Sequence, residues 1–187
     1  MGGPNDKRII LVDGQRLSIT AFLDCALRHI RESHRVLRTW ADGVCIGQND
    51  VEDRNQQVRL IGSIYSTARH TVIFPGPSSP ECDSTMKLLD SQNPTISQSP
   101  ERSHGAINNH HIDWIEAMLE DLILAKPWFK RTWVLQELVL SVHPWIQCRK
   151  TRVRWDLFYD HVLSSQSPSW RSDSRKLLTG MSDARVN

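Results

Sequence analysis

The chain has 187 residues, of which 39% are hydrophobic and 24% are charged, and a formal net charge of +2. This composition is typical of a globular protein with a sizeable core, and the charge is too small for a nucleic-acid-binding protein. The sequence has no run of about 18 apolar residues that could span a membrane, and its first residues lack the apolar region of a signal peptide. We therefore expect a cytoplasmic protein that binds neither nucleic acid nor membrane.

The first half of the chain predicts alternating strands and helices. Short apolar arms flank Asp13-Gly14, a pair that favours a tight hairpin turn. The expected elements in chain order are a hairpin at 8–19, a helix from 20 to about 33, a buried strand at 36–46, a helix from about 49 to 68 and a strand at 70–74. Strand, helix and strand of these lengths indicate a parallel α/β sheet.

The second half predicts fewer elements around a polar insertion. Residues 91–111 are rich in Ser, Asn, Gln and Pro and are expected to form a mobile surface insertion. The other expected elements are helical turns at 84–89, a helix from 113, a helix from 127, a strand at 144–148 and a helix at 155–163. We expect one domain over residues 1–163 and a disordered polar tail over 164–187.

The segment from Lys126 to Leu140 carries the strongest candidate for a site. Pro127 suits the first position of a helix, and Trp133 and Glu137 stand four residues apart, so their side chains share a face. A carboxylate beside an indole on an apolar helix is either a functional group or a structural one, here paired with Arg131, Lys130 or a backbone donor. Both readings stay open on the residues alone.

Other candidates have simple structural alternatives. Asp42 follows an expected strand, where parallel sheets place ligand-binding groups, but it could equally cap the next loop. Cys25 and His29 stand four apart on a helix, yet two ligands without a second pair do not predict a metal site. The four cysteines include no C-x-x-C pair and are typical of reduced intracellular thiols.

Several separated blocks together resemble one family. They are Trp40-Ala-Asp-Gly-Val-Cys-Ile-Gly-Gln-Asn-Asp, then Asp53-Arg54, then Ile64-Tyr65, then Pro127-Trp-Phe-Lys-Arg-Thr-Trp-Val-Leu-Gln-Glu. In this order and spacing they resemble the fungal heterokaryon incompatibility (HET) domain, and the resemblance covers roughly residues 9–158. An ordered set of blocks is far more specific than any single motif.

The resemblance carries expectations for fold, function and site. It implies a role in fungal self/non-self recognition and programmed cell death, exerted through protein partners such as other HET-domain or immune-receptor-like proteins and through self-association. It also implies a flavodoxin/TIR-like parallel sheet with flanking helices. Some TIR domains cleave NAD with a glutamate that follows a Trp. By that analogy Glu137 would be catalytic, Asp42 and Trp133 would bind the nucleotide, and NAD would be a substrate, with no required cofactor or metal.

The sequence also departs from the family pattern. The family normally opens with a strand of the type Tyr-x-Ala-Leu-Ser-Tyr-x-Trp-Gly, which is not visible ahead of the expected hairpin. The first central strand of the expected sheet would then be missing. Three hypotheses follow: a HET-domain signalling protein, an NAD glycohydrolase that uses Glu137, and an inactive fragment that acts only as an interaction module.

Overall fold

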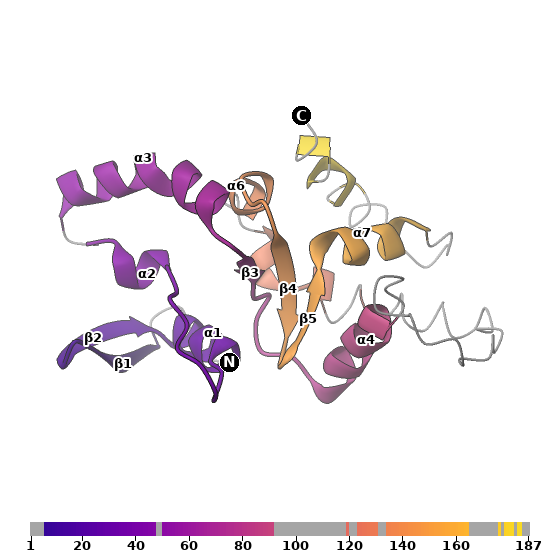
Figure 1. Cartoon of the computed structure of the whole chain (residues 1–187), viewed down its shortest axis with the longest axis horizontal. Coiled ribbons are helices and arrows are strands. Elements are labelled where there is room, and N and C mark those ends of the chain that lie inside the picture. The colour runs from indigo at the N-terminus through magenta and orange to yellow at the C-terminus, as the bar shows by residue number, and fades with distance from the viewer. Residues whose placement is uncertain are drawn as a thin grey trace. The chain divides into compact units, whose positions relative to one another are not determined.

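The chain folds into two compact units, Met1–Ile64 and Tyr65–Asn187 (Figure 1). The computed structural model describes residues 6–47, 50–91, 119, 123–130, 134–164, 176, 178–181 and 183–184. The predicted insertion at 91–111, apart from Ser91, and most of the predicted helix from 113 lie outside these residues. Ser91 is helical, so the insertion does not begin there. Among the described residues, no helix has the length and apolar character needed to cross a membrane.

The first unit begins with the predicted hairpin. β1 (Lys7–Val12) pairs antiparallel with β2 (Gln15–Thr20), with Val12 opposite Gln15. Asp13 and Gly14 have φ of 51° and 78°. Positive φ at both central residues is typical of the two-residue type I′ turn, whose twist matches that of the two strands. Asp-Gly is one of the residue pairs that this turn prefers. The local sequence therefore determines this hairpin.

Helices follow the hairpin in the first unit. α1 (Ala21–Ile30) starts as predicted, because the Thr20 hydroxyl accepts the Leu23 N–H at 3.2 Å and so caps the helix. α2 (Asp42–Cys45) is a single turn, and the predicted long helix is α3 (Val51–Thr67). Among the described residues of this unit, the buried apolar ones are Ile19, Ala26 and Ile46.

The predicted strand at 36–46 is wrong. Val36 is 95% exposed, residues 36–41 form no strand, and Asp42–Cys45 is helical. The physical reason lies in the polar residues after Trp40. The Asp42 carboxylate accepts the Gly43 N–H at 2.7 Å, which gives the backbone a local hydrogen bond in place of a sheet ladder.

The second unit contains a mixed three-stranded sheet in the order β3–β4–β5. β3 (Thr71–Ile73) and β4 (Pro144–Cys148) are parallel, as predicted, whereas β5 (Thr151–Arg154) runs antiparallel to β4. The architecture is therefore α/β, as expected, but the described sheet is not all parallel. β5 was not among the predicted elements.

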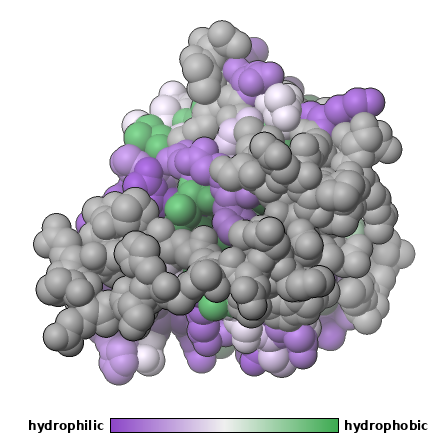
Figure 2. All heavy atoms as spheres, turned by 90° about the vertical axis from the view of Figure 1, so that its right-hand side faces the viewer, coloured by the Kyte–Doolittle hydropathy of each residue, from purple (hydrophilic) through white to green (hydrophobic). Residues whose placement is uncertain are grey.

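Helices surround this sheet (Figure 1). They are α4 (Pro80–Ser91), the 3-10 helix η2 (Pro127–Lys130), α6 (Val134–Val139) and α7 (Trp155–Ser164). α4 extends the predicted helical turns at both ends, and α7 confirms the predicted helix at 155. Figure 2 shows one face of the molecule, on which the described residues are mainly hydrophilic with a small hydrophobic group between them.

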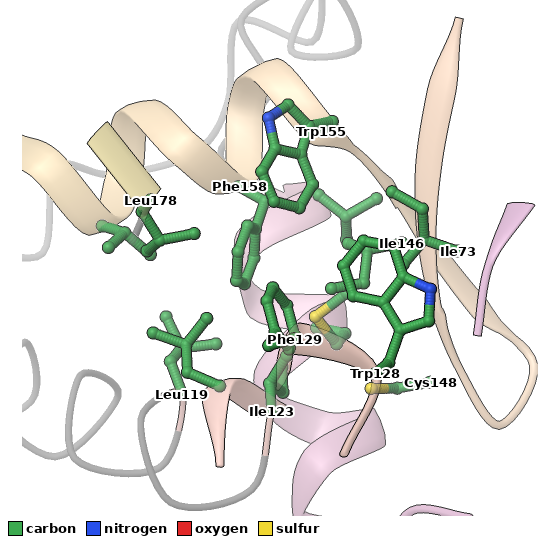
Figure 3. Packing of buried hydrophobic residues seen from close by; sticks show 14 of the residues in the cluster. Ile73, Leu119, Ile123, Trp128, Phe129, Ile146, Cys148, Trp155, Phe158 and Leu178 are labelled. Carbon is green, nitrogen blue, oxygen red and sulfur yellow. The ribbon is translucent and has the colours of Figure 1, made fainter. Parts of the chain in front are cut away.

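Four aromatic rings form the centre of the core (Figure 3). Phe129 lies 4.8 Å from Trp128 and 6.4 Å from Trp155, and Trp155 lies 5.6 Å from Phe158, measured between ring centroids. All four side chains are buried. Leu178 and Met181, from the segment expected to be a polar tail, are also buried in this cluster. These two apolar side chains allow that segment to share the core.

A polar contact joins α4 to β5 beside the core. Asp83 accepts a hydrogen bond from the Thr151 hydroxyl at 2.8 Å and pairs with Lys87 at 2.8 Å. Burial tends to raise the pKa of the Asp83 carboxyl, but the bonds from Lys87 and Thr151 outweigh this and hold the pKa below its ordinary value of 3.8. The folded state therefore favours the ionised carboxylate.

We expect Asp83→Asn to lower the free energy of unfolding by about 1 kcal/mol at neutral pH, because it removes the charge from these two bonds. The folded pKa is the lower one, so the contribution is present above pH 3.8 and is lost as the pH falls through the folded pKa. Urea unfolding at neutral and acidic pH measures both effects.

Asp156→Asn is the matched control for this prediction. Asp156 also lies in the first turn of its helix and pairs with Arg154 at 2.9 Å, but its side chain is 50% exposed. An exposed pair contributes little to stability, so the control should stay near wild type. Equal losses from the two variants would contradict a specific role of the bond to Thr151.

Candidate functional site

Glu137 on α6 is attached to the aromatic core through its side chain. Its Oε2 accepts the indole N–H of Trp128 at 3.3 Å. Trp128 is 3% exposed, and its ring meets that of Phe129 edge to face, so the indole has little freedom to move. The half-buried Glu137 carboxylate is thus held by an anchor that the core itself fixes.

The main chain of Glu137 is held by a second set of bonds. The Ser141 hydroxyl donates to the Glu137 carbonyl oxygen, and the Ser141 and Thr71 hydroxyl oxygens lie 2.7 Å apart. A carbonyl can only accept, so the one proton of Ser141 goes to Glu137 and Thr71 donates to Ser141. Both hydroxyls are buried. This relay joins the end of α6 to the first residue of β3.

Aromatic and imidazole groups lie beside this relay. The Trp145 indole N–H donates to Nδ1 of His70 at 3.2 Å, and the His70 and His143 rings are 6.3 Å apart. The Thr71 N–H donates to the His143 carbonyl at 3.0 Å. Across the described residues, no group of three or more His, Cys, Asp or Glu side chains could hold a metal. In the described residues, the polar groups beside the relay therefore act through hydrogen bonds.

The structure does not determine where the other predicted site residues, Asp42 and Trp133, lie relative to Glu137. Trp133 lies outside the described residues. Asp42 belongs to the first unit and Glu137 to the second. The Asp42 carboxylate accepts the N–H of Gly43, and the Asp42 carbonyl accepts the N–H of Ile46 at 3.1 Å. Asp42 therefore makes the local capping bonds that the sequence allowed as the alternative to ligand binding.

Cys25 and His29 form a local contact within α1. His29 Nδ1 lies 2.8 Å from the Cys25 carbonyl oxygen and 3.6 Å from the Cys25 sulfur. Burial raises the pKa of the Cys25 thiol, which keeps it protonated. The contact stays within one helix turn and brings in no second pair of ligands.

Sequence reasoning missed the partners of Glu137. Trp128 is a buried core residue, but its bond to Glu137 joins residues nine apart in the sequence and does not follow helical spacing. Thr71 lies 70 residues from Ser141, so only the sheet pairing reveals that contact. The one local signal was Ser141, four residues after Glu137.

This arrangement defines what the site can do chemically. A carboxylate accepts hydrogen bonds at both oxygens, and the indole N–H donates one to Oε2. A carboxylate fixed in this way can accept bonds from a vicinal diol or stabilise a positive charge that develops nearby. Such a carboxylate suits binding or charge stabilisation.

A family comparison agrees with the ordered motif blocks. The family described as heterokaryon incompatibility protein (HET) matches residues 3–137, from the start of the hairpin region to Glu137 itself. This match covers well over half of the chain and includes both the Trp40 block and the Pro127–Glu137 block. The protein therefore belongs to the HET family.

One curated relative is similar over much of the chain. It is heterokaryon incompatibility protein 6, OR allele, of Neurospora crassa, which is 26% identical over 165 residues, covering 71% of this chain and 24% of the relative. The chain thus spans about a quarter of the relative's length. No solved structure matches the chain.

We expect Ser141→Ala to lower the free energy of unfolding by about 1–2 kcal/mol, because it removes a buried relay that joins α6 to β3. Urea unfolding measures the loss, and faster amide exchange in residues 134–139 should accompany it. Ser84→Ala is the control, because the Ser84 hydroxyl makes the same kind of helical bond, to the Pro80 carbonyl, on an exposed surface. Equal effects of the two changes would contradict a structural role for the relay.

Proposed function

We propose that this protein acts in fungal heterokaryon incompatibility, as a domain that triggers programmed cell death when unlike strains fuse. The family match, which carries both motif blocks and ends at Glu137, is the observation that supports this most directly. The name of the Neurospora crassa relative agrees with it. In this proposal the domain works in the cytoplasm through protein partners, either further copies of itself or other HET-domain or immune-receptor-like proteins.

Induced expression of the chain in a filamentous fungus should lower colony viability, by about tenfold in our proposal. Phe129→Ala should abolish the effect, because loss of this buried ring costs about 3–5 kcal/mol of stability and unfolds the core around Trp128. Ser84→Ala, on the exposed face of α4, should keep it. Normal growth with immunoblot-verified wild-type protein would contradict the proposal.

A second candidate function is cleavage of NAD by Glu137. The anchored carboxylate favours it, because a preorganised negative group lowers the cost of a developing positive charge. In this reaction the bond between nicotinamide and C1′ of the ribose breaks, the carboxylate stabilises the oxocarbenium-like carbon, and water adds there to give ADP-ribose and a proton. The proposal includes a flavodoxin/TIR-like fold, supported by the parallel β3–β4 pair with its helices.

Under this candidate, purified protein releases nicotinamide from NAD, and Glu137→Gln lowers the rate by about 100-fold or more. Gln is informative because its amide oxygen can still accept the Trp128 N–H, so the charge is lost while the contact and the melting temperature are kept. Chromatographic assay of nicotinamide measures the rate. Glu52→Gln, at the exposed start of α3, is the control and should act like wild type.

Two outcomes would remove this candidate. Equal nicotinamide release from wild type and Glu137→Gln would show that the carboxylate has no role in the chemistry. If folded wild-type protein released no nicotinamide but still lowered colony viability, the protein would act in signalling without cleaving NAD. The two candidate functions are therefore separable with the same set of variants.

A further inference from the structure

Two of the four cysteines, far apart in the sequence, meet inside the second unit. Cys82 lies in the first turn of α4 and Cys148 is the last residue of β4, and their sulfur atoms are 2.6 Å apart. Both side chains are buried, with 1% and 2% exposed. No sequence pattern predicts this pair, because 66 residues separate the two cysteines.

Polar groups around the pair hold the adjoining loops in place. The Arg149 N–H donates to the Ser78 hydroxyl at 3.1 Å, and Lys126 donates to the Pro77 carbonyl at 3.0 Å. These bonds tie the segment before α4 to the end of β4 and to the chain before η2. The sulfur atoms are thus brought together by contacts on both sides, and a small movement would bring them to bonding distance.

The two thiols differ in their tendency to ionise. The hydrogen bond with Cys148 lowers the pKa of Cys82 despite its burial, with help from Ser78 and the positive charge of Lys126. The same bond, together with burial, raises the pKa of Cys148. Cys82 is therefore the more acidic thiol of the pair and the better first nucleophile, and Cys148 is the less acidic partner.

Other uses of the pair fit the structure less well. A zinc site needs four ligands, and no group of three or more potential metal ligands is found in the described part of the chain. The other cysteines, Cys25 and Cys45, belong to the first unit. Two adjacent thiols with unequal acidity are instead the arrangement that redox-sensitive proteins use, with one attacking and one resolving cysteine.

We propose that Cys82 and Cys148 form a redox pair that a small peroxide converts reversibly into a disulfide between α4 and β4. The Cys82 thiolate attacks one peroxide oxygen, the O–O bond breaks, and the leaving oxygen takes a proton to become water with hydrogen peroxide. Cys148 then attacks the sulfur of the Cys82 sulfenic acid, and its own proton leaves with the hydroxyl as a second water. The two sulfur atoms together supply the two electrons that reduce the peroxide.

The disulfide would have a clear structural effect. It would join two residues that are 66 positions apart in the sequence. It would also hold the first turn of α4 against the end of β4, beside the hydrogen bond between Asp83 and Thr151. A cross-link over such a long segment restricts the unfolded chain strongly. We expect the oxidised protein to melt roughly 5–10 °C higher than the reduced protein.

The experiment treats the purified chain with hydrogen peroxide, blocks remaining thiols with an alkylating agent, and maps the peptides by mass spectrometry. The expected result is a Cys82–Cys148 cross-linked peptide, a protein lighter by two hydrogens, and the rise in melting temperature, all reversed by dithiothreitol. The Cys25→Ser/Cys45→Ser double variant should behave in the same way. Cys82→Ala and Cys148→Ala should show neither the cross-link nor the melting shift.

The wild-type peptide map decides the proposal even where an alanine variant fails to fold. Cys82 and Cys148 recovered as alkylated free thiols would overturn the proposal. So would cross-links that join either residue to Cys25 or Cys45, or sulfinic acids formed separately on the two cysteines. The readout does not depend on cell death or on NAD, so its outcome is independent of the proposed function.

Discussion

The burial of Trp128, Phe129, Trp155 and Phe158 against one another is the constraint on which the second unit depends. These rings come from η2 and α7, and the cluster also takes in side chains from β3, β4, α4 and α6. Aromatic side chains bury roughly 150–250 Å² each, so each contributes several kcal/mol to folding. The described part of the sheet has three short strands. The aromatic side chains of neighbouring helices help to support it.

The same core determines where Glu137 lies. Its side chain is bonded to Trp128 of the core, and its carbonyl accepts from Ser141, which is bonded to Thr71 at the start of β3. The carboxylate thus depends on the aromatic cluster and on the parallel strand pair together. A substitution that loosened either support would shift the carboxylate without touching it. Stability and any function of Glu137 are coupled through these contacts.

Local signals allowed much of the fold to be predicted. Asp13-Gly14 determined the hairpin, Thr20 determined the start of α1, and the apolar run at 144–148 gave β4. The strand at 36–46 failed because a local hydrogen bond of Asp42 competes with a sheet ladder. β5 was missed because Arg149 takes a φ of 50°, a turn conformation that its side chain does not signal. Contacts over 66 to 70 residues, such as the Cys82–Cys148 and Thr71–Ser141 pairs, arise from tertiary pairing that no periodicity reveals.

The parallel strands β3 and β4 carry different chemistry at their two ends. The amino end holds the Thr71–Ser141 relay, and the carboxyl end, where α/β sheets usually place functional groups, holds Cys148 with its partner Cys82. Cys82, Cys148 and Trp128 all belong to one buried cluster. Closely packed interiors transmit small displacements, so a bond formed between the two sulfurs would be felt at the indole that holds Glu137. The cysteine pair and the indole that holds Glu137 therefore share the packing of a single core.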